Sequence, residues 1–404
     1  MKVLQLSSSL KHDEAERGIY PISRALIKAG HTSIIVGSAD RDNELITRLV
    51  RDGAIYHQMP MPKKSWWALR HIFALRRLIL KYQPDIIHVH SRTPAWVLHW
   101  ALRPYPEDLQ PKVVSSLYGF YPLNSYSKAL FQADKLISSS KSIDTYFRKK
   151  LAPKKDKKDN DKLPDITDSL ICVPRGVDLR KYPYRHHASV YWLHQTFAQF
   201  PELEHKKWLI FPTIVGSQYG QEWLVDILGN LKEKFPNIHA VIMDDDPNTR
   251  QNQCVFYEEF VQRLHALGLF DRVTFVGKSP PDMKEWLASA NVVLALANHP
   301  ESIGMTALQA IHLGTPVVGW AKGAFADILN DLYPQGLVKE QTARALCQSV
   351  KFQLANQIRP AMTHEYNIEQ MVAGTLSVYQ ALCPFCQLVT KDRHDNLVAV
   401  TAKS

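Results

Sequence analysis

The 404-residue sequence has no apolar run near the roughly 20 residues that a membrane-spanning helix needs. Cysteine is scarce: the five residues are scattered and odd in number, which suits a reducing cytoplasm rather than a disulfide scaffold. No Gly-x-Gly-x-x-Gly follows the expected first strand of either half, so a nicotinamide-dependent enzyme is poorly supported. No zinc-finger or RNA-binding signature occurs, which argues against a nucleic-acid partner.

Two short features near the ends of the chain bear on localisation. The apolar stretch at residues 3–8 is too short for a signal peptide and predicts a first strand. Cys383 and Cys386 form an isolated Cys-x-x-Cys, which is weak evidence for zinc or redox chemistry; a tail without that role is favoured. We therefore expect a cytoplasmic protein.

The charge of the chain points to an anionic partner. Net charge is +10, with 45% hydrophobic and 22% charged residues, as in a soluble globular protein. The segment 149–165 is a lysine-rich insertion that reads as a surface loop, and residues 62–81 read as a basic, Trp-containing amphipathic helix. The helix is expected to pack on a sheet, and both segments also permit peripheral contact with an anionic membrane.

Continuous Val/Ile/Leu runs alternate with helical patterns, which predicts parallel sheets buried on both faces. The pattern restarts near residue 208, after a polar and aromatic connector at 181–195. We expect an α/β protein of two tandem Rossmann-like domains, residues 1–180 and 195–360, facing a central cleft. A helix within 361–404 is expected to cross back, followed by a tail. The expected strands are 3–8, 32–38, 55–60, 85–91, 112–118, 135–140 and 169–174, then 208–213, 239–245, 272–278, 291–297 and 316–321.

The segment ANHPESIGMTALQAIHLGTPVVGW (297–320) carries the clearest chemistry. A strand is expected to end at Ala297 and a helix to start near Ser302 or Ile303. Free amides at Ile303, Gly304 and Met305 would then favour an anionic diphosphate or sugar hydroxyls. Glu301 stands just before that helix, and Gln309, eight residues later, would share roughly its face.

Several segments resemble the family 4 retaining glycosyltransferases of GT-B fold, in particular those of bacterial lipopolysaccharide core assembly. They follow in the family's order and span nearly the whole chain to about residue 330. The segments are ERGIYPISRALIKAGH (16–31), DIIHVHSRTPAW (85–96), YGFY (118–121), VPRGVD (173–178), GQEWLV (220–225), LHALGLFDRVTFVG (264–277) and PESIGMTALQA (300–310).

The resemblance implies a nucleotide-sugar donor held by the second domain, and a glycan or lipid-linked acceptor held mainly by the first. Transfer would retain the anomeric configuration and need neither metal nor cofactor. Glu301 would bind donor-sugar hydroxyls, Ser302 to Met305 would line the sugar, and Gln309 would bind the ribose. In the family, an arginine, a lysine, a histidine and a glycine-rich turn hold the diphosphate.

The positions of those phosphate-binding residues differ here. The arginine position falls on Ile214, the lysine position on Tyr219 and the histidine position on Tyr118. The paired glycines fall on Asp13 and Glu14. Each lost charge-assisted hydrogen bond costs about 1.5–3 kcal/mol, so other cations would have to compensate. Arg92, Arg175, Lys278 and Lys322 follow predicted strands and could do so or contact the acceptor, although a plain surface cation is the commoner role of each.

Two functions remain open at this point. The first is an active glycosyltransferase at the cytoplasmic face of the inner membrane, extending a lipopolysaccharide or lipooligosaccharide core. The second is a degenerate GT-B protein that serves as a scaffold or partner subunit. Binding of a donor discriminates between them. The sequence names neither the donor, nor the acceptor, nor the oligomeric state.

Overall fold

The structure, a computed structural model, describes residues 1–8, 10, 18–39, 44–61, 66–151, 167–216, 218–247, 255–278, 280 and 282–384. Asp13, Glu14, Cys386 and most of the basic segment 149–165 lie outside these residues. None of the described helices combines the length and apolarity needed to cross a membrane.

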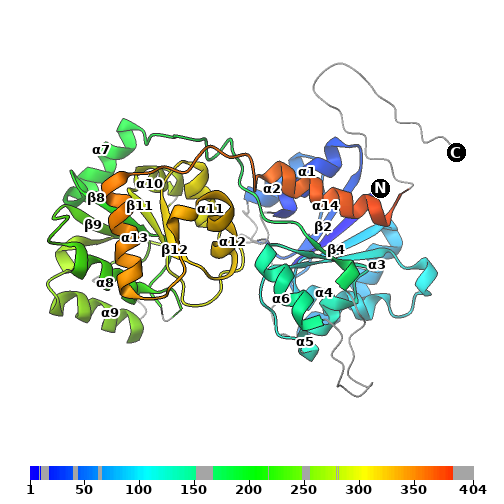
Figure 1. Cartoon of the computed structure of the whole chain (residues 1–404). Helices are drawn as coiled ribbons and strands as arrows, with labels where there is room; N and C mark the ends of the chain where they lie inside the picture. Colours follow the sequence, from blue (N-terminus) through cyan, green and yellow to red (C-terminus); the bar gives the residue numbers. More distant parts are fainter. Residues whose placement is uncertain are drawn as a thin grey trace, which may run out of the picture. The chain divides into compact units, whose positions relative to one another are not determined.

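The chain divides into two compact units (Figure 1). The N-terminal unit comprises Met1–Ser139, Ile143–Val173 and the chain from Gln370 onward, and the C-terminal unit comprises Ser140–Ser142 and Pro174–Glu369. The first boundary therefore lies at residue 173, not near residue 180. The two chain passages meet in the C-terminal unit, where Val177 pairs with Asn367 as parallel bridge partners.

The N-terminal unit contains a seven-stranded parallel sheet in the order β3-β2-β1-β4-β5-β6-β7. Its strands are β1 (Lys2–Leu6), β2 (Thr32–Gly37), β3 (Ile55–Gln58), β4 (Ile86–Val89), β5 (Lys112–Leu117), β6 (Lys135–Ser138) and β7 (Leu170–Cys172). The associated helices are α1 (Ile19–Lys28), α2 (Glu44–Arg51), α3 (Ile72–Tyr82), α4 (Arg92–Leu102), α5 (Ser125–Lys128), α6 (Lys141–Leu151) and α14 (Ile368–Leu382). All seven strands predicted for this half are present.

Helices cover both faces of this sheet. Leu4 and Leu6 of β1 pack in the same buried cluster as α3 and α4 residues such as Leu75 and Leu98. On the opposite face, Ile35 of β2 packs in a cluster with residues of α1 and α2. Alternate residues of a strand therefore meet different helices, which explains why the strands read as continuous apolar runs.

The C-terminal unit contains a six-stranded parallel sheet in the order β10-β9-β8-β11-β12-β13. Its strands are β8 (Lys207–Phe211), β9 (Ile238–Ile242), β10 (Val273–Phe275), β11 (Val292–Ala295), β12 (Val317–Trp320) and β13 (Leu337–Val338). Its helices are α7 (Val190–Gln199), α8 (Gln221–Leu231), α9 (Val255–Ala266), α10 (Met283–Ser289), α11 (Met305–His312), α12 (Gly323–Leu332) and α13 (Ala343–Asn356).

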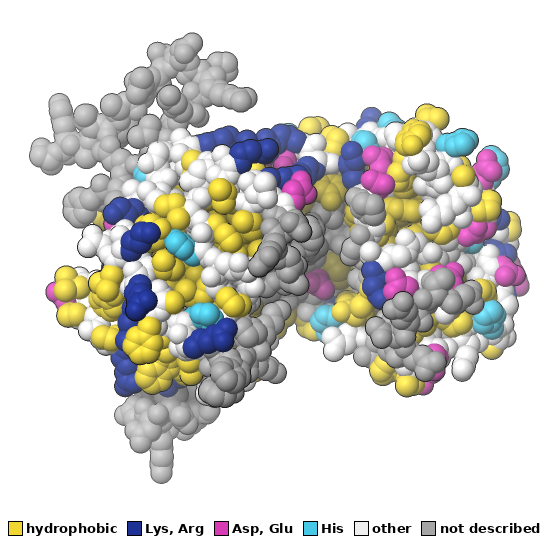
Figure 2. Space-filling model, turned by 180° about the vertical axis from the view of Figure 1, so that it is seen from behind, with side chains coloured by type: hydrophobic (Ala, Val, Ile, Leu, Met, Phe, Trp, Pro, Cys, Tyr) yellow, Lys and Arg dark blue, Asp and Glu magenta, His cyan; other side chains and the backbone are white. Residues whose placement is uncertain are grey.

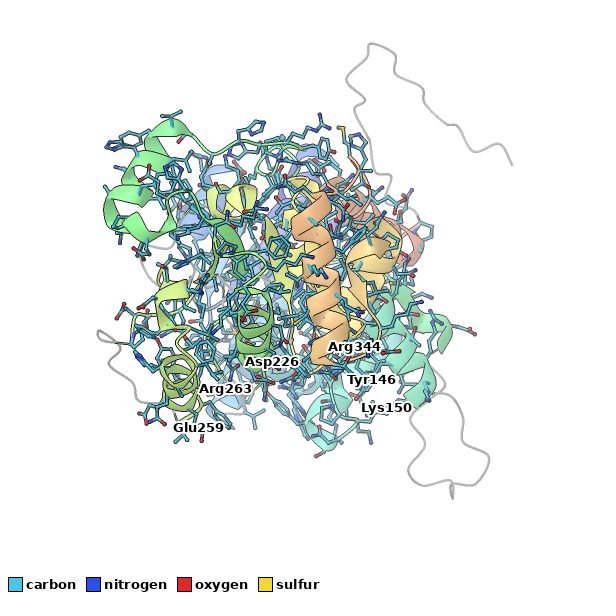
Figure 3. The ribbon with its side chains drawn as sticks, turned by 60° about the vertical axis from the view of Figure 1, so that its left-hand side comes forward. Tyr146, Lys150, Asp226, Glu259, Arg263 and Arg344 are labelled. Carbon is cyan, nitrogen blue, oxygen red and sulfur yellow. The ribbon has the colours of Figure 1, made fainter. Side chains whose placement is uncertain are left out.

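Two helical layers enclose this second sheet. One buried cluster joins β-strand residues such as Leu209 to α8, α9 and α13, and another joins residues such as Ile210 to α10, α11 and α12. Figure 3 labels Asp226 of α8 and Arg263 of α9, whose side chains form a 2.9 Å ion pair between neighbouring helices of the first layer. Such an exposed pair adds only about 0–1 kcal/mol, so the apolar clusters dominate.

Two local expectations for the C-terminal unit are wrong. The segment 181–195 is not a connector throughout, because α7 begins at Val190 with Ser189 as a helix cap that accepts a hydrogen bond from the Trp192 amide. Strand β13 was not predicted. It is an edge strand that pairs with β12. Because it has only two residues, it shows almost no hydrophobic periodicity in the sequence.

Candidate functional site

The order of the C-terminal sheet marks one edge as a binding position. Strand β8 lies between β9 and β11. Strands β9 and β10 extend the sheet on one side of β8, and the later strands β11, β12 and β13 extend it on the other side, so the strand order reverses between β8 and β11. In open parallel sheets, ligands bind outside the carboxyl ends of the strands at such a reversal. The loops that leave this point are residues 212–220, after β8, and 296–304, after β11. These are the segments in which the sequence places the donor-binding residues.

The two loops are fastened to each other by backbone contacts. The Asn298 amide donates to the Gln218 carbonyl (2.9 Å), and His299 Nδ1 lies 3.1 Å from that same oxygen. Gly220 has φ +80°, and a Cβ there would lie 2.0 Å from the Leu296 carbonyl oxygen. Only glycine permits this approach. The loops therefore form one local structure.

Asn298 extends this connection to three more elements. Its Oδ1 accepts hydrogen bonds from Trp223 Nε1 of α8 (2.9 Å) and from Gln341 Nε2 (3.2 Å). Its Nδ2 donates to Glu222, and its carbonyl accepts from Lys322 Nζ (3.2 Å). Sequence reasoning missed Asn298, Glu222 and Gln341 as supports of the site. Only the position of Asn298 beside the His-Pro-Glu segment could have signalled one of them.

Glu301 is held at the end of the second loop by its backbone. Its carbonyl accepts the Ala324 amide of α12 (2.7 Å), and its main chain pairs with Gly323 as an isolated bridge. The half-buried side chain accepts the Ser302 amide through Oε1 (3.1 Å). The carboxylate is thus positioned by a fixed backbone while its other oxygen makes no hydrogen bond to a described residue.

Helix α11 starts later than predicted. Gly304 has φ +68° and forms the N-cap, so the helix begins at Met305 and not at Ser302 or Ile303. Its first intrahelical bond joins the Leu308 amide to the Gly304 carbonyl. The four amides without an intrahelical partner are therefore those of Gly304, Met305, Thr306 and Ala307. Ser302 and Ile303 lie in the preceding turn and are half-buried.

Gln309 does not share a helical face with Glu301, contrary to the expectation. Glu301 lies outside α11, so helical spacing does not relate the two residues. Gln309 is on the second turn of α11 and is 7% exposed.

The positions of the expected phosphate cations lie in the first loop. Ile214 is 38% exposed, and the half-buried Tyr219 presents its ring edgewise to His299, with ring centroids 6.1 Å apart. Tyr219 also donates its amide to the Gly216 carbonyl (3.0 Å). The loop thus carries an apolar and an aromatic side chain at the reversal point, and neither has a positive charge.

The four candidate cations occupy different surroundings. Lys322 contacts the second loop through Asn298 and also donates to Gln341, so it belongs to this site. Lys278 forms ion pairs with Asp244 and Asp245, and carboxylates neutralise it. Arg175 is 6% exposed, in the segment that leads to Val177. Arg92 lies in the N-terminal unit, as the first residue of α4.

Tyr118, at the end of β5 in the N-terminal unit, belongs to a buried polar network. Its hydroxyl lies 2.8 Å from His90 Nδ1, while His90 Nε2 lies 3.2 Å from Gln5 Oε1. His88 contacts Tyr379 of α14 (2.6 Å) and Ser116 (2.8 Å). Complete burial lowers the pKa of His88 to about 3, so its imidazole is neutral near pH 7. Both histidines therefore have side-chain hydrogen-bond partners within the core of the unit.

Within the described residues, no three His, Cys, Asp or Glu side chains are arranged to hold a metal ion. Asp244 is fully buried and accepts the Val215 amide (2.9 Å). Cys383 is half-buried, just after the end of α14.

Two family models match the chain. "Glycosyltransferase Family 4" covers residues 15–157, and "Glycosyl transferases group 1" covers residues 195–370. Apart from Ser140–Ser142 and Gln370, the first match falls in the N-terminal unit and the second in the C-terminal unit, where it includes both loops of the reversal point.

Three proteins illustrate what the chain resembles. It is 24% identical to a subunit of the human phosphatidylinositol N-acetylglucosaminyltransferase, over 95% of this chain and 76% of that protein. The fold superimposes on a glycosyltransferase from Rickettsia africae with a TM-score of 0.76 and 18% identity, covering 95% and 98% of the two chains. The fold also superimposes on the lipopolysaccharide outer core galactosyltransferase WaaB with a TM-score of 0.66 and 12% identity, covering 94% of this chain and 99% of that one.

Proposed function

Because the chain belongs to family 4 of the glycosyltransferases and has their GT-B fold, we propose that it transfers a sugar from a nucleotide-sugar to a lipid-linked glycan. The acceptor we favour is a lipopolysaccharide or lipooligosaccharide core. Transfer would retain the anomeric configuration and use no metal or other cofactor, as the resemblance implies. The observation that carries the proposal is the pair of interlocked loops at the β8/β11 reversal, which ends in Glu301 and the start of α11.

The roles proposed for these residues follow from their chemistry. The carboxylate of Glu301 can accept hydrogen bonds from donor-sugar hydroxyls. Amides at the N-terminus of α11 carry the positive end of a helix dipole, which favours negative charge on the donor. Lys322 supplies a cation beside the second loop. Gln309 is proposed to contact the ribose.

A lipid-linked acceptor is supported by two relatives and by the surface of the N-terminal unit. The names of the human and WaaB proteins refer to a phospholipid and to lipopolysaccharide. Figure 2 shows Lys, Arg and hydrophobic side chains close together on the face of the N-terminal unit that the view presents. Such a mixed surface suits peripheral binding to an anionic membrane.

The degenerate alternative is favoured by one observation, namely the uncharged pair Ile214 and Tyr219 at the reversal point. Restoring two charge-assisted hydrogen bonds would contribute about 3–6 kcal/mol. This corresponds to roughly a hundred-fold or more in affinity. The alternative therefore makes a measurable prediction of its own.

Calorimetric titration with UDP-, GDP- and ADP-sugars, at low salt and with EDTA present, tests the proposal. We expect the native protein to bind at least one of them, and the variant Ile214→Arg/Tyr219→Lys to bind it roughly a hundred-fold more tightly. The control is Val255→Arg/Tyr191→Lys, which adds the same charges at positions 65% and 72% exposed in the same unit. Binding only after the two cations are restored would favour the degenerate protein, and no binding by either would contradict the donor site.

The proposed membrane contact depends on the outer face of α3 and the turn before it. Leu69, Phe73 and Leu80 are 41%, 68% and 63% exposed. Arg70, Arg77 and Lys81 are exposed beside them, and residues 66–84 contain no acid. Arg76 fastens α3 to α4 by donating to the Trp100 and Ala101 carbonyls.

Sedimentation with vesicles containing an anionic phospholipid measures this contact. We expect Phe73→Asp/Leu80→Asp to lower the bound fraction at least tenfold, because it removes apolar area and adds negative charge to the lipid-facing surface. Phe352→Asp, at a 45% exposed position of α13, is the control and should sediment like the native protein. Unchanged sedimentation of the double variant would show that α3 is not the contact.

A further inference from the structure

The N-terminal sheet has its own reversal point, between β1 and β4. The rule that places ligands at the β8/β11 reversal applies here as well. Arg92 begins α4 directly after the short segment that leaves β4. Ser91 ties this point to the end of β1, since its Oγ accepts the Ser8 amide (3.0 Å). Arg92 is therefore the cation that the fold places nearest to this edge on the β4 side.

Two tyrosines clamp the Arg92 guanidinium. Its Cζ lies 4.7 Å from the Tyr121 ring centroid and 4.6 Å from that of Tyr126. Tyr126 is itself fixed to α4, because its hydroxyl lies 2.8 Å from Thr93 Oγ1 and its carbonyl accepts Trp96 Nε1 (3.1 Å). Stacking of this kind holds the plane of the guanidinium and leaves its N–H edge available.

The N–H edge of Arg92 is unused among the residues that the structure describes. The guanidinium forms no hydrogen bond or ion pair with any of them. The other candidate cations whose contacts are known differ in this respect: Lys278 is paired with two carboxylates, and Lys322 donates to a carbonyl and an amide oxygen. A half-buried arginine with a fixed plane and five N–H donors suits a planar or tetrahedral oxyanion.

We propose that Arg92, clamped by Tyr121 and Tyr126, binds an oxyanion of the acceptor, either a phosphate or a carboxylate. This inference rests on the proposed function, because it names the acceptor class of that same enzyme as anionic. Three observations support it: the clamp, the unused N–H edge and the reversal point. The start of α4, which lacks a side-chain cap, adds partial positive charge but would not make a site alone.

Binding of small sugars to the native, full-length protein tests the proposal without requiring catalysis. The probes are glucose 6-phosphate, glucuronate and glucose, titrated by ligand-observed NMR. We expect the phosphate sugar, the carboxylate sugar or both to bind at least tenfold more tightly than glucose. The probe that binds distinguishes a phosphate-bearing acceptor from a carboxylate-bearing one.

Three variants separate Arg92 from general charge. Arg92→Gln should lose the preference for the anionic sugar by roughly 10- to 100-fold. Arg92→Lys should retain part of it, because the charge remains while the fork geometry is lost. Arg103→Gln is the matched control, since Arg103 follows the other end of α4 and also stacks on an aromatic ring, that of Trp100 (4.8 Å). It should bind like the native protein. Should Arg92→Gln fail to fold by circular dichroism, Arg92→Lys carries the comparison.

The proposal is overturned by equal binding of glucose and the two anionic sugars, or by unchanged selectivity in Arg92→Gln. A loss of nucleotide-sugar binding in Arg92→Gln would assign the residue to the donor and overturn the acceptor role. The donor titration is a separate measurement on the native protein. If no nucleotide-sugar binds but the anionic sugar still binds in an Arg92-dependent way, the enzyme function is contradicted and the anion site is retained.

Discussion

Glu301→Ala is expected to lower the rate of sugar transfer by roughly a hundred- to ten-thousand-fold. A carboxylate that accepts two hydrogen bonds from the donor sugar contributes about 1.5–3 kcal/mol through each, which gives this range. The fold should survive, because Glu301 is anchored through its main chain to Ala324 and Gly323. The measurement is initial transfer rate at saturating donor, alongside thermal unfolding.

The matched control is Glu340→Ala, an exposed carboxylate that follows β13 in the same unit. It should leave both the transfer rate and the unfolding temperature unchanged. Glu301→Gln separates shape from charge and should retain more activity than the alanine variant. Native-like turnover by Glu301→Ala would remove Glu301 from the site.

Gly323→Ala is expected to destabilise the C-terminal unit by about 2–5 kcal/mol and to abolish transfer. Gly323 has φ +56°, which costs an alanine about 1–2 kcal/mol. A Cβ there would also lie 2.3 Å from the Glu301 carbonyl oxygen and 2.6 Å from its nitrogen. Because both neighbours are backbone atoms, the whole Glu301 turn must shift, at a further cost of about 1–3 kcal/mol.

Gly268 provides a control with almost the same backbone conformation. Its φ is +57°, and a Cβ there would meet nothing within 4 Å. Gly268→Ala should therefore cost about 1–2 kcal/mol and leave transfer intact. Denaturant unfolding of both variants, followed by transfer assays, gives the comparison. Equal destabilisation of the two would show that crowding against Glu301 has no effect.

The fold was readable from the sequence because the strands are buried on both faces. The runs IIV of β2 and WLIF of β8 are apolar without alternation, as expected of a parallel sheet between two helical layers. Strand β13 escaped prediction because two residues give no period. Helix α7 was not predicted because the polar and aromatic composition of its first residues resembles that of a linker. A single serine such as Ser189 is common in loops, so it did not identify the helix start by itself.

The site was less predictable because its geometry depends on contacts distant in sequence. The start of α11 was misplaced since Gly304 adopts φ +68°, at a point where a Cβ would lie 2.8 Å from Ile328 and 3.2 Å from Phe325 of α12. Asn298 forms hydrogen bonds with Gln218, Trp223 and Gln341. These partners are distant from it in sequence, so local sequence patterns do not predict the contacts. The Arg92 clamp uses Tyr121 and Tyr126 from beyond the next strand, so spacing along the chain does not reveal it.

The contact of α14 with the N-terminal sheet has a consequence for synthesis of the chain on the ribosome. His88 on β4 acquires its Tyr379 partner only when α14 has emerged, since Tyr379 follows His88 by 291 residues. The C-terminal unit, almost entirely contiguous from Pro174 to Glu369, is complete before that. Synthesis therefore finishes the second unit first and leaves the first with an open face. During this interval, His88 depends on water for the hydrogen bond that Tyr379 later supplies.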